Sequence, residues 1–187
     1  LNLEIKPVQE DPNKLVQGSR GGYKGEKLSL NFQNVEVRAV LPVIAALAKD
    51  GAVASIDTRH ALVMRRAVDA GARIINDVTA LAGDPDSMRA AAESGAGIVL
   101  MHMQGEPRTM QKDPQYRDAP LDIYDYFSTR LDACAQAGIA RARIVLDPGI
   151  GFGKNDRHNI ALLDDLALLH GLGCGILLGV SRKSFIG

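Results

Sequence analysis

The feature that most constrains the fold of this chain is an alternation between short apolar runs and longer segments with helical spacing, which begins near residue 35. Each apolar run is rich in β-branched residues and nearly continuous in hydrophobicity, as strands buried on both faces must be. Strands that alternate with helices in this way are typical of a parallel sheet in an α/β protein. The runs expected to form strands are residues 52–56, 73–76, 97–102, 143–147 and 175–180.

Helical segments fill the gaps around these strands. The expected helices are residues 35–49, 59–70, 85–94, 121–137 and 159–170. Asp84 followed by Pro85 predicts an N-cap and a first-turn proline, and Pro42 predicts a kink or a boundary in the first helix. Three helices are followed by a glycine suited to the left-handed residue that closes a helix, at positions 71, 95 and 138.

Residues 1–34 follow a different pattern. They contain two prolines, a Gly-Ser-Arg-Gly-Gly patch and mixed charges. We therefore expect a loop-rich N-terminal segment, with one strand near residues 27–32, ahead of a single folded region at 35–187.

Composition narrows the classes of protein further. The chain has 187 residues, of which 46% are hydrophobic, so it can bury a sizeable core. Its 22 basic and 22 acidic residues balance, which argues against nucleic acid as a partner. No apolar stretch is long enough to cross a membrane. Cys134 and Cys174 lack metal-type spacing and are expected to be free thiols, as in the reducing cytoplasm.

Polar residues stand at the carboxyl ends of the expected strands, where a buried parallel strand should be apolar. They include Asp57, Asn76, Asp147 and Lys183. Each carboxylate or amide alone is commonly the N-cap of the next helix. Because loops after the carboxyl ends of parallel strands converge on the ligand site, the four together favour one shared pocket. His102, without a partner carboxylate at a recognisable spacing, is expected to be a core histidine bonded to a backbone carbonyl.

A glycine-rich segment follows the fourth strand. Gly149, Gly151 and Gly153 surround Phe152, and Lys154 follows. This spacing predicts a sharply bent loop whose backbone can come close to a ligand. Because the segment continues into Lys-Asn-Asp-Arg and no helix is expected there, it does not meet the dinucleotide-binding fingerprint.

Five strings in this order resemble the signature segments of the dihydropteroate synthase family. They are Ser-Ile-Asp-Thr at 55–58, Ile-Ile-Asn-Asp at 74–77, Leu-Met-His-Met-Gln-Gly at 100–105, Leu-Asp-Pro-Gly-Ile-Gly-Phe-Gly-Lys at 146–154 and Ser-Arg-Lys-Ser-Phe-Ile-Gly at 181–187. The last two are the most specific. The resemblance implies a (β/α)8 TIM barrel in which the five strands are the third to seventh.

The resemblance also implies roles for individual residues. Asp57, Asn76 and Asp147 would hydrogen-bond the amino-pyrimidine edge of a pterin, and Lys183 would contact the ring and its linking position. Asp147, Lys183 and Asp57 are accordingly the expected catalytic residues. The apolar walls and floor of the pterin slot would be formed by Val78, Val99, Met101, Phe152 and Gly179. Ser181 would face the p-aminobenzoate carboxylate, and Arg182 would help organise the anion side.

The reaction implied is the condensation of 7,8-dihydropterin pyrophosphate with p-aminobenzoate in folate biosynthesis, in the cytoplasm. Family members imply Mg²⁺, a homodimer and sensitivity to sulfonamides. The family's magnesium-binding first-strand segment and its Ser-Thr-Arg-Pro-Gly loop are not found, and no metal ligand is identifiable. The last strand of the barrel is also missing after Gly187. We therefore expect the chain to be incomplete at both ends, and a chain of this kind can be inactive by itself.

Three other readings compete with the synthase. A pterin-binding methyltransferase shares the barrel and the Asp and Asn strand ends but lacks the Ser-Arg-Lys-Ser motif at 181–184. A noncatalytic pterin-binding remnant would bind pterin without turnover. An unrelated doubly wound α/β protein would have an open sheet and no shared pocket at these strand ends.

Overall fold

The computed structural model describes residues 37–106, 109–181 and 183. Its centre is a five-stranded sheet in which every neighbouring pair is parallel and the strand order follows the chain, β1-β2-β3-β4-β5. The strands are β1 Ser55–Asp57, β2 Ile74–Asp77, β3 Gly97–Met101, β4 Ile144–Asp147 and β5 Gly175–Ile176. All five overlap the runs predicted to be strands, and β1 and β2 each extend one residue further, to Asp57 and Asp77.

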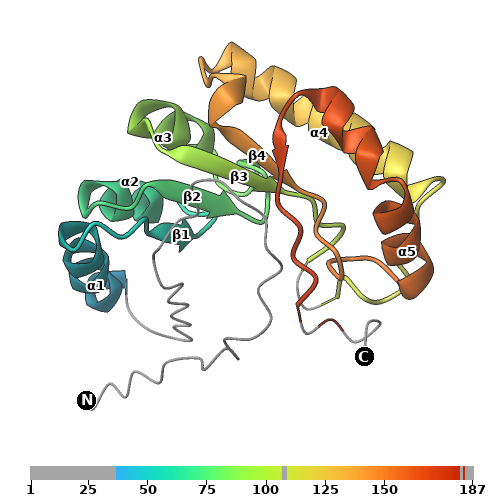
Figure 1. Ribbon diagram of the computed structural model, residues 1–187, viewed down its shortest axis with the longest axis horizontal. Helices are drawn as coiled ribbons and strands as arrows, with labels where there is room; N and C mark the ends of the chain where they lie inside the picture. The colour runs from blue at the N-terminus through green and yellow to red at the C-terminus, as the bar shows by residue number, and fades with distance from the viewer. Residues whose placement is uncertain (1–36, 107–108, 182, 184–187) are drawn as a thin grey trace, which may run out of the picture.

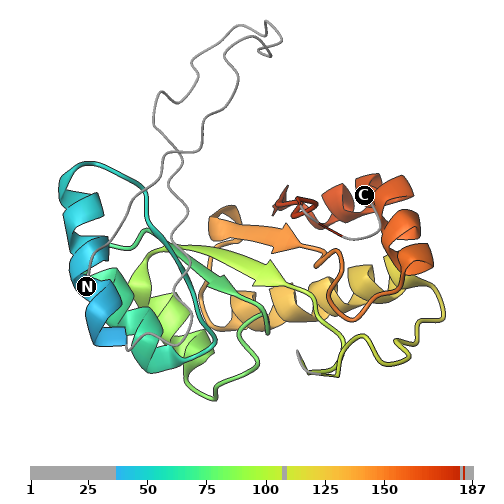
Figure 2. The same cartoon turned by 90° about the horizontal axis from the view of Figure 1, so that it is seen from below.

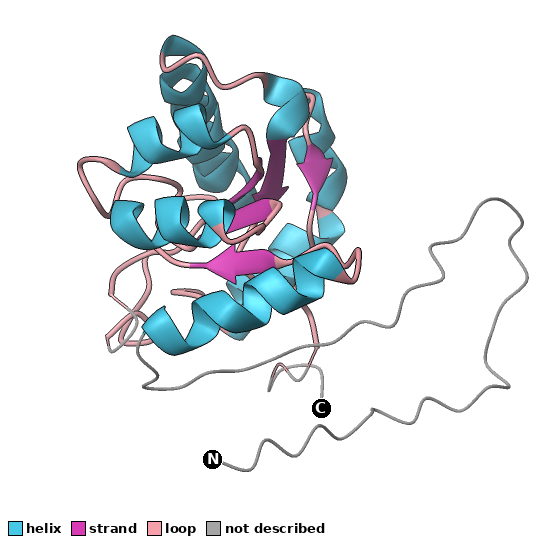
Figure 3. Cartoon of the chain, turned by 90° about the vertical axis from the view of Figure 1, so that its left-hand side faces the viewer, coloured by secondary structure: helices cyan, strands magenta, loops and turns pink. Residues whose placement is uncertain are grey.

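The helices form an arc around the outer side of this sheet (Figure 1). They are α1 Val37–Lys49, α2 Ala61–Asp69, α3 Ser87–Ser94, α4 Ala119–Gln136 and α5 Asp156–Asp164, with 3₁₀ helices η1 Arg141–Arg143 and η2 Leu166–Leu172. Figure 3, seen from the end, shows the strands fanned inside a ring of helices. Figure 2 shows α4 running along one side of the strands. A doubly wound sheet carries helices on both faces, so this arrangement agrees with the predicted barrel class and not with the doubly wound alternative.

Alternate residues of the strands face the helices. The main core cluster contains Ile75, Ile98, Leu100, Ile144 and Leu146, packed with residues of α2, α3, α4, α5 and η2. Burial of each such side chain contributes about 1.5–3 kcal/mol. The residues between them in sequence, such as Asn76 and Val99, lie outside this cluster. The inner face of the sheet is therefore available for a site.

The helix ends agree with the glycine signals but not with the proline signal. Gly71, Gly95 and Gly138 all have positive φ, of 108°, 68° and 81°, directly after α2, α3 and α4. However, α3 begins at Ser87 rather than at residue 85. The carboxylate of Asp84 does not cap α3. Instead it accepts the backbone N–H groups of Ala61 and Asp86, each at 2.9 Å, so it ties the start of α2 to this turn.

The last described unit also differs from the prediction. The segment expected to be one helix at 159–170 is α5 followed by η2, and α5 begins earlier because Asn155 and His158 form a capping box. The strand expected at 175–180 pairs only over Gly175–Ile176, and one further backbone bond joins the Leu177 N–H to the Leu146 carbonyl at 2.9 Å.

The remaining predictions concern Pro42, the two cysteines, membrane spans and the N-terminal segment. Pro42 lies inside α1, and Cys134 and Cys174 are free thiols. Among the helices described here, none is long and apolar enough to cross a membrane. The loop-rich segment at 1–34 and its strand at 27–32 lie outside the described residues.

Candidate functional site

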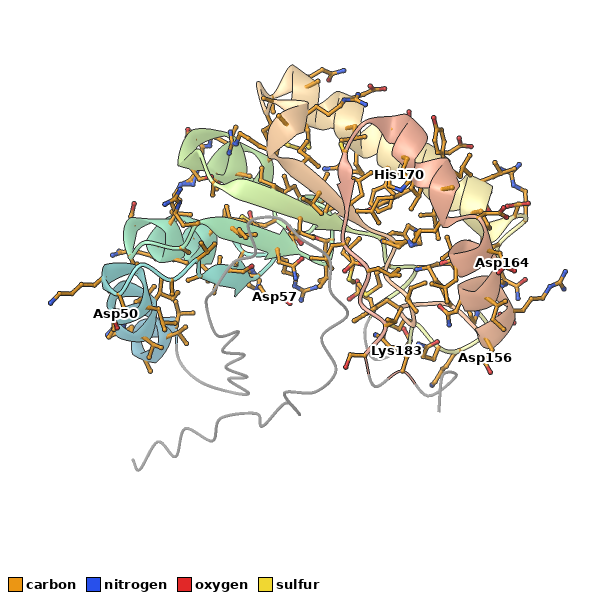
Figure 4. All side chains as sticks on the ribbon, viewed as in Figure 1. Asp50, Asp57, Asp156, Asp164, His170 and Lys183 are labelled. Carbon is orange, nitrogen blue, oxygen red and sulfur yellow. The ribbon has the colours of Figure 1, made fainter. Side chains whose placement is uncertain are left out.

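The strand register brings the predicted polar residues to one edge of the sheet. Asp57 is paired with Asn76 across β1 and β2, and Met101 with Asp147 across β3 and β4. Figure 4 places Asp57 and Lys183 on the side of the sheet opposite the arc formed by α2, α3 and α4. Asp57, Asn76 and Asp147 therefore lie at the same edge of the sheet, as a shared pocket requires.

Asn76 presents a hydrogen-bond acceptor that the described residues leave unused. Its Nδ2 donates to Oδ2 of Asp57 at 3.3 Å, which fixes the orientation of the amide. Its Oδ1 is buried and has no hydrogen-bond partner among the residues that the structure describes. Burying an unpaired amide oxygen costs about 1–3 kcal/mol. A ligand N–H at this position would remove that cost.

Asp57 extends the same acceptor edge. Its side chain is exposed, yet neighbouring protein atoms displace water from part of the carboxyl. This partial burial, and then the negative charge of Asp77, raise its pKa, while the Asn76 hydrogen bond opposes the rise. A carboxylate in this state gains from a positively polarised donor placed against it.

Asp147 is more enclosed than Asp57, with 9% of the residue exposed. Its Oδ1 accepts the backbone N–H of Gly149 at 2.8 Å. Burial raises its pKa, and that hydrogen bond, then Lys154 and Lys183, act in the opposite direction. The two lysines thus offset part of the cost of holding a negative charge here.

Lys183 closes the other side of the site. Its Nζ lies 4.3 Å from the centroid of the Phe152 ring, a cation–π contact. Its aliphatic stem lies along Gly151, where an added Cβ would meet the Lys183 Cδ at 3.2 Å. The positive charge and the aromatic wall are therefore held together.

The glycine loop is bent as predicted, and Gly149 and Gly153 lie close against backbone carbonyl groups. A Cβ on Gly149 would clash with the His102 carbonyl oxygen, and one on Gly153 would clash with that of Gln104. Both glycines have positive φ, 66° and 63°. The loop is thus docked on the end of β3.

The prediction that no helix follows the glycine loop directly is wrong. Helix α5 begins at Asp156, directly after the loop, where the sequence was expected to continue without one. The glycines at 149 and 153 are nonetheless occupied by contacts with the end of β3.

Lys154 is a residue whose role the sequence did not reveal. It is 2% exposed, and its Nζ lies 3.0 Å from His102 Nδ1, from the Gly149 carbonyl oxygen and from the Phe152 carbonyl oxygen. His102 is buried as expected, but its ring is paired with this amine. Burial, and then the charge of Lys154, lower the pKa of His102 to about 3. The only local signal was a lysine placed between a glycine turn and a helix cap.

Asp77 is a second residue without a predicted role. It is fully buried, and its carboxylate accepts the backbone N–H and hydroxyl of Thr79 at 2.7 Å and the N–H of Leu81 at 3.1 Å. Ala80 and Leu81 have positive φ, 49° and 61°. Asp77 therefore stabilises a strained turn directly after Asn76 and Val78.

The remaining predicted residues lie in different surroundings. Val99 and Met101 are buried on the inner face, Val78 and Phe152 are half-buried, and Gly179 and Ser181 are exposed. Arg182 lies outside the described residues. Within the ranges 37–106 and 109–181, no group of three or more His, Cys, Asp or Glu is placed to hold a metal ion.

Known proteins with similar sequences and folds share these features. A family model described as "Pterin binding enzyme" matches residues 28–187. The chain is 46% identical over 153 residues to the dihydropteroate synthase of Escherichia coli K12, covering 81% of this chain and 54% of that protein. It thus spans about half the length of the curated relatives that it matches.

Solved structures agree with the sequence comparison. The structure resembles Yersinia pestis dihydropteroate synthase with a sulfonamide drug complex, with a TM-score of 0.77, 43% identity, and coverage of 81% of this chain and 55% of that one. It also resembles the Xanthomonas albilineans enzyme in complex with 7,8-dihydropteroate, with a TM-score of 0.74, 39% identity, and coverage of 83% of this chain and 59% of that one.

Proposed function

We propose that this chain, which belongs to the pterin-binding enzyme family, forms the pterin site of a dihydropteroate synthase. In this proposal it takes part in condensing 7,8-dihydropterin pyrophosphate with p-aminobenzoate. The observation that carries the proposal is the buried Oδ1 of Asn76, which lies beside the Asp57 carboxylate and has no partner in the part of the chain that the structure describes. An amide oxygen and carboxylates suit a planar heterocycle that presents N–H donors.

Recognition of the pterin would divide between two sides of the site. Asp57, Asn76 and Asp147 would accept hydrogen bonds from the amino-pyrimidine edge. Phe152, with Lys183 above its ring, would lie along the other side of the heterocycle. The buried Val99 and Met101, which share the inner face with these acceptors, would supply an apolar floor.

The reaction would be a substitution at the exocyclic methylene carbon of the pterin. The bond between that carbon and the diphosphate oxygen breaks, and diphosphate leaves with the electron pair. Positive charge then develops on the carbon conjugated to the ring. The aniline nitrogen of p-aminobenzoate forms the new C–N bond and releases one proton to solvent.

Asp147 suits this chemistry because it is a fixed, enclosed carboxylate. Stabilisation by a preorganised charge is largest where charge develops in the transition state and water is excluded. Lys183 would hold the linking position and the anionic side of the substrates. Ser181 would face the carboxylate of p-aminobenzoate, the substrate that sulfonamides would mimic, and Arg182 would help organise the anion side.

Two further parts of the proposal, Mg²⁺ as cofactor and a homodimer, rest on the family resemblance alone. A cytoplasmic location is proposed from the two cysteines, which suit a reducing compartment. Since the described residues do not offer a fitting set of metal ligands, no step of the mechanism is routed through a metal.

The synthase is favoured over the pterin-binding methyltransferase because the relatives compared above are named dihydropteroate synthases. A noncatalytic pterin-binding remnant is the alternative that the experiment must separate. Both readings require the pterin site, but only the synthase requires p-aminobenzoate for turnover.

The test is release of diphosphate from 7,8-dihydropterin pyrophosphate and Mg²⁺, measured with and without p-aminobenzoate. We expect release that depends on p-aminobenzoate and is lost in Lys183→Ala but kept in Lys112→Ala, a control at an exposed lysine. Pterin binding without release would identify the noncatalytic remnant. Absence of pterin binding would refute both.

A further inference from the structure

Lys154 is an enclosed amine without a carboxylate in hydrogen-bond contact among the described residues. Its Nζ has three contacts at 3.0 Å, to His102 Nδ1 and to the carbonyl oxygens of Gly149 and Phe152, and a weaker one at 3.4 Å to the His102 carbonyl. A lysine ammonium has three N–H donors. The three close acceptors use all of them.

These three acceptors lie on two segments. His102 follows β3, and Gly149 and Phe152 belong to the loop after β4. Other side chains also hold this loop: the Asn159 amide oxygen accepts the Gly151 N–H at 2.8 Å, and the Tyr116 hydroxyl donates to the Gly153 carbonyl at 2.9 Å. Those two bonds fix its second half. Lys154 joins its first half to the end of β3.

The loop carries two groups of the pterin site. Phe152 lies beneath the Lys183 ammonium, and the Gly149 N–H is bonded to Asp147. A shift of the loop would therefore move the aromatic wall and remove a hydrogen bond from the carboxylate. We propose that Lys154 is a positioning residue, whose ammonium locks the Gly149–Gly153 loop onto the end of β3 and so sets the geometry of the pterin site. The inference rests on the proposed function for its link to pterin.

The protonation of Lys154 gives this role a measurable signature. Burial lowers its pKa to about 7, the Asp147 charge opposes the shift and the Lys183 charge adds to it. The other titratable groups that face it are His102 and, from α5, His158. As pH rises through neutrality, Lys154 loses its proton and one of its three donors. The loop should then become less protected.

The experiment uses hydrogen exchange of the ligand-free protein at pH 6 and the affinity for 6-hydroxymethyl-7,8-dihydropterin by calorimetry. In Lys154→Met, the amides of Gly149, Gly151 and Phe152 should exchange about tenfold faster or more, the scale of one lost charge-assisted hydrogen bond, and pterin affinity should fall by a similar factor. Lys112→Met, the same change at an exposed lysine, should alter neither.

A second variant separates position from titration. Lys154→Arg keeps a positive donor that does not titrate below about pH 12. The unmodified protein should lose loop protection and pterin affinity between pH 6 and pH 8.5, whereas the arginine variant should show neither loss. If Lys154→Met does not fold, this comparison still decides the question.

Unchanged loop protection in Lys154→Met would overturn the inference, as would an equal increase of exchange in β2 and β3, which indicates a global effect. If the unmodified protein does not bind the pterin at all, the proposed function fails. Exchange in the loop then decides the positioning role by itself.

Discussion

Replacing Asp147 by asparagine turns one oxygen of the site into an amide nitrogen and hardly changes the size of the side chain. The asparagine Oδ1 can keep the bond from the Gly149 N–H, but its NH₂ group then faces the pterin donors. One charge-assisted hydrogen bond is lost, worth about 1.5–3 kcal/mol or roughly 10–150-fold in affinity. Turnover should fall at least as much, because the carboxylate also stabilises the developing positive charge.

The same substitution should not destabilise the protein. The pKa of Asp147 is raised in the fold, chiefly by burial, so the native state binds a proton more readily than the unfolded chain. Ionisation at higher pH therefore disfavours the folded state. Asparagine carries no charge and avoids this cost. At pH 7 the free energy of unfolding in Asp147→Asn should equal or exceed that of the unmodified protein.

Calorimetry with 6-hydroxymethyl-7,8-dihydropterin measures the affinity, and urea unfolding measures the stability. Asp132→Asn, the same change at an exposed residue of α4, is the control and should alter neither quantity. Unchanged pterin affinity in Asp147→Asn would refute its role. A drop in affinity together with an equal loss of stability would show that the residue acts through the fold.

Three further substitutions test the parts that support the site. Asp77→Ala removes the acceptor for the Leu81 N–H and for Thr79 and should lower the free energy of unfolding by about 2–4 kcal/mol in urea titrations; a loss below about 0.5 kcal/mol would contradict the role of Asp77 in the strained turn. His102, with its pKa lowered to about 3, stays neutral while the unfolded chain takes up a proton. Stability should therefore fall by up to about 1.4 kcal/mol per pH unit as pH drops below about 6.5, in addition to the slope of other groups, and His102→Gln should lack this added slope. Gly149→Ala forces a side chain at φ 66° against the His102 carbonyl and should cost more than about 2 kcal/mol, measured by thermal unfolding; a loss within about 0.5 kcal/mol would show that the loop is not docked on β3.

The sequence predicted the strands well because their signal is local. A parallel strand covered on both faces is apolar nearly throughout, so a run such as residues 97–101 is recognisable without knowing its neighbours. The polar strand ends were recognisable for the same reason. Asp57 and Asn76 stand out against apolar runs, and parallel pairing brings them to one edge.

The features that the sequence did not predict depend on distant partners. Asp84 and Pro85 have the pattern of a helix start, yet the Asp84 carboxylate bonds Ala61 of another helix. The pairing of His102 with Lys154 spans 52 positions, and neither residue differs locally from a surface or core residue of its type. Long-range hydrogen bonds of this kind have no sequence spacing by which to find them.

The alternation of side chains along each strand separates two demands on the protein. Ile75 packs among the helices, whereas its neighbour Asn76 faces the inner side, with an amide oxygen that no described residue pairs. Substitutions at inward positions should therefore change what the protein binds while leaving it folded, and substitutions at outward positions should do the reverse. A family built on this sheet can acquire new ligands by exchanging every second residue near the strand ends, so its tolerance of mutation should itself follow a two-residue period.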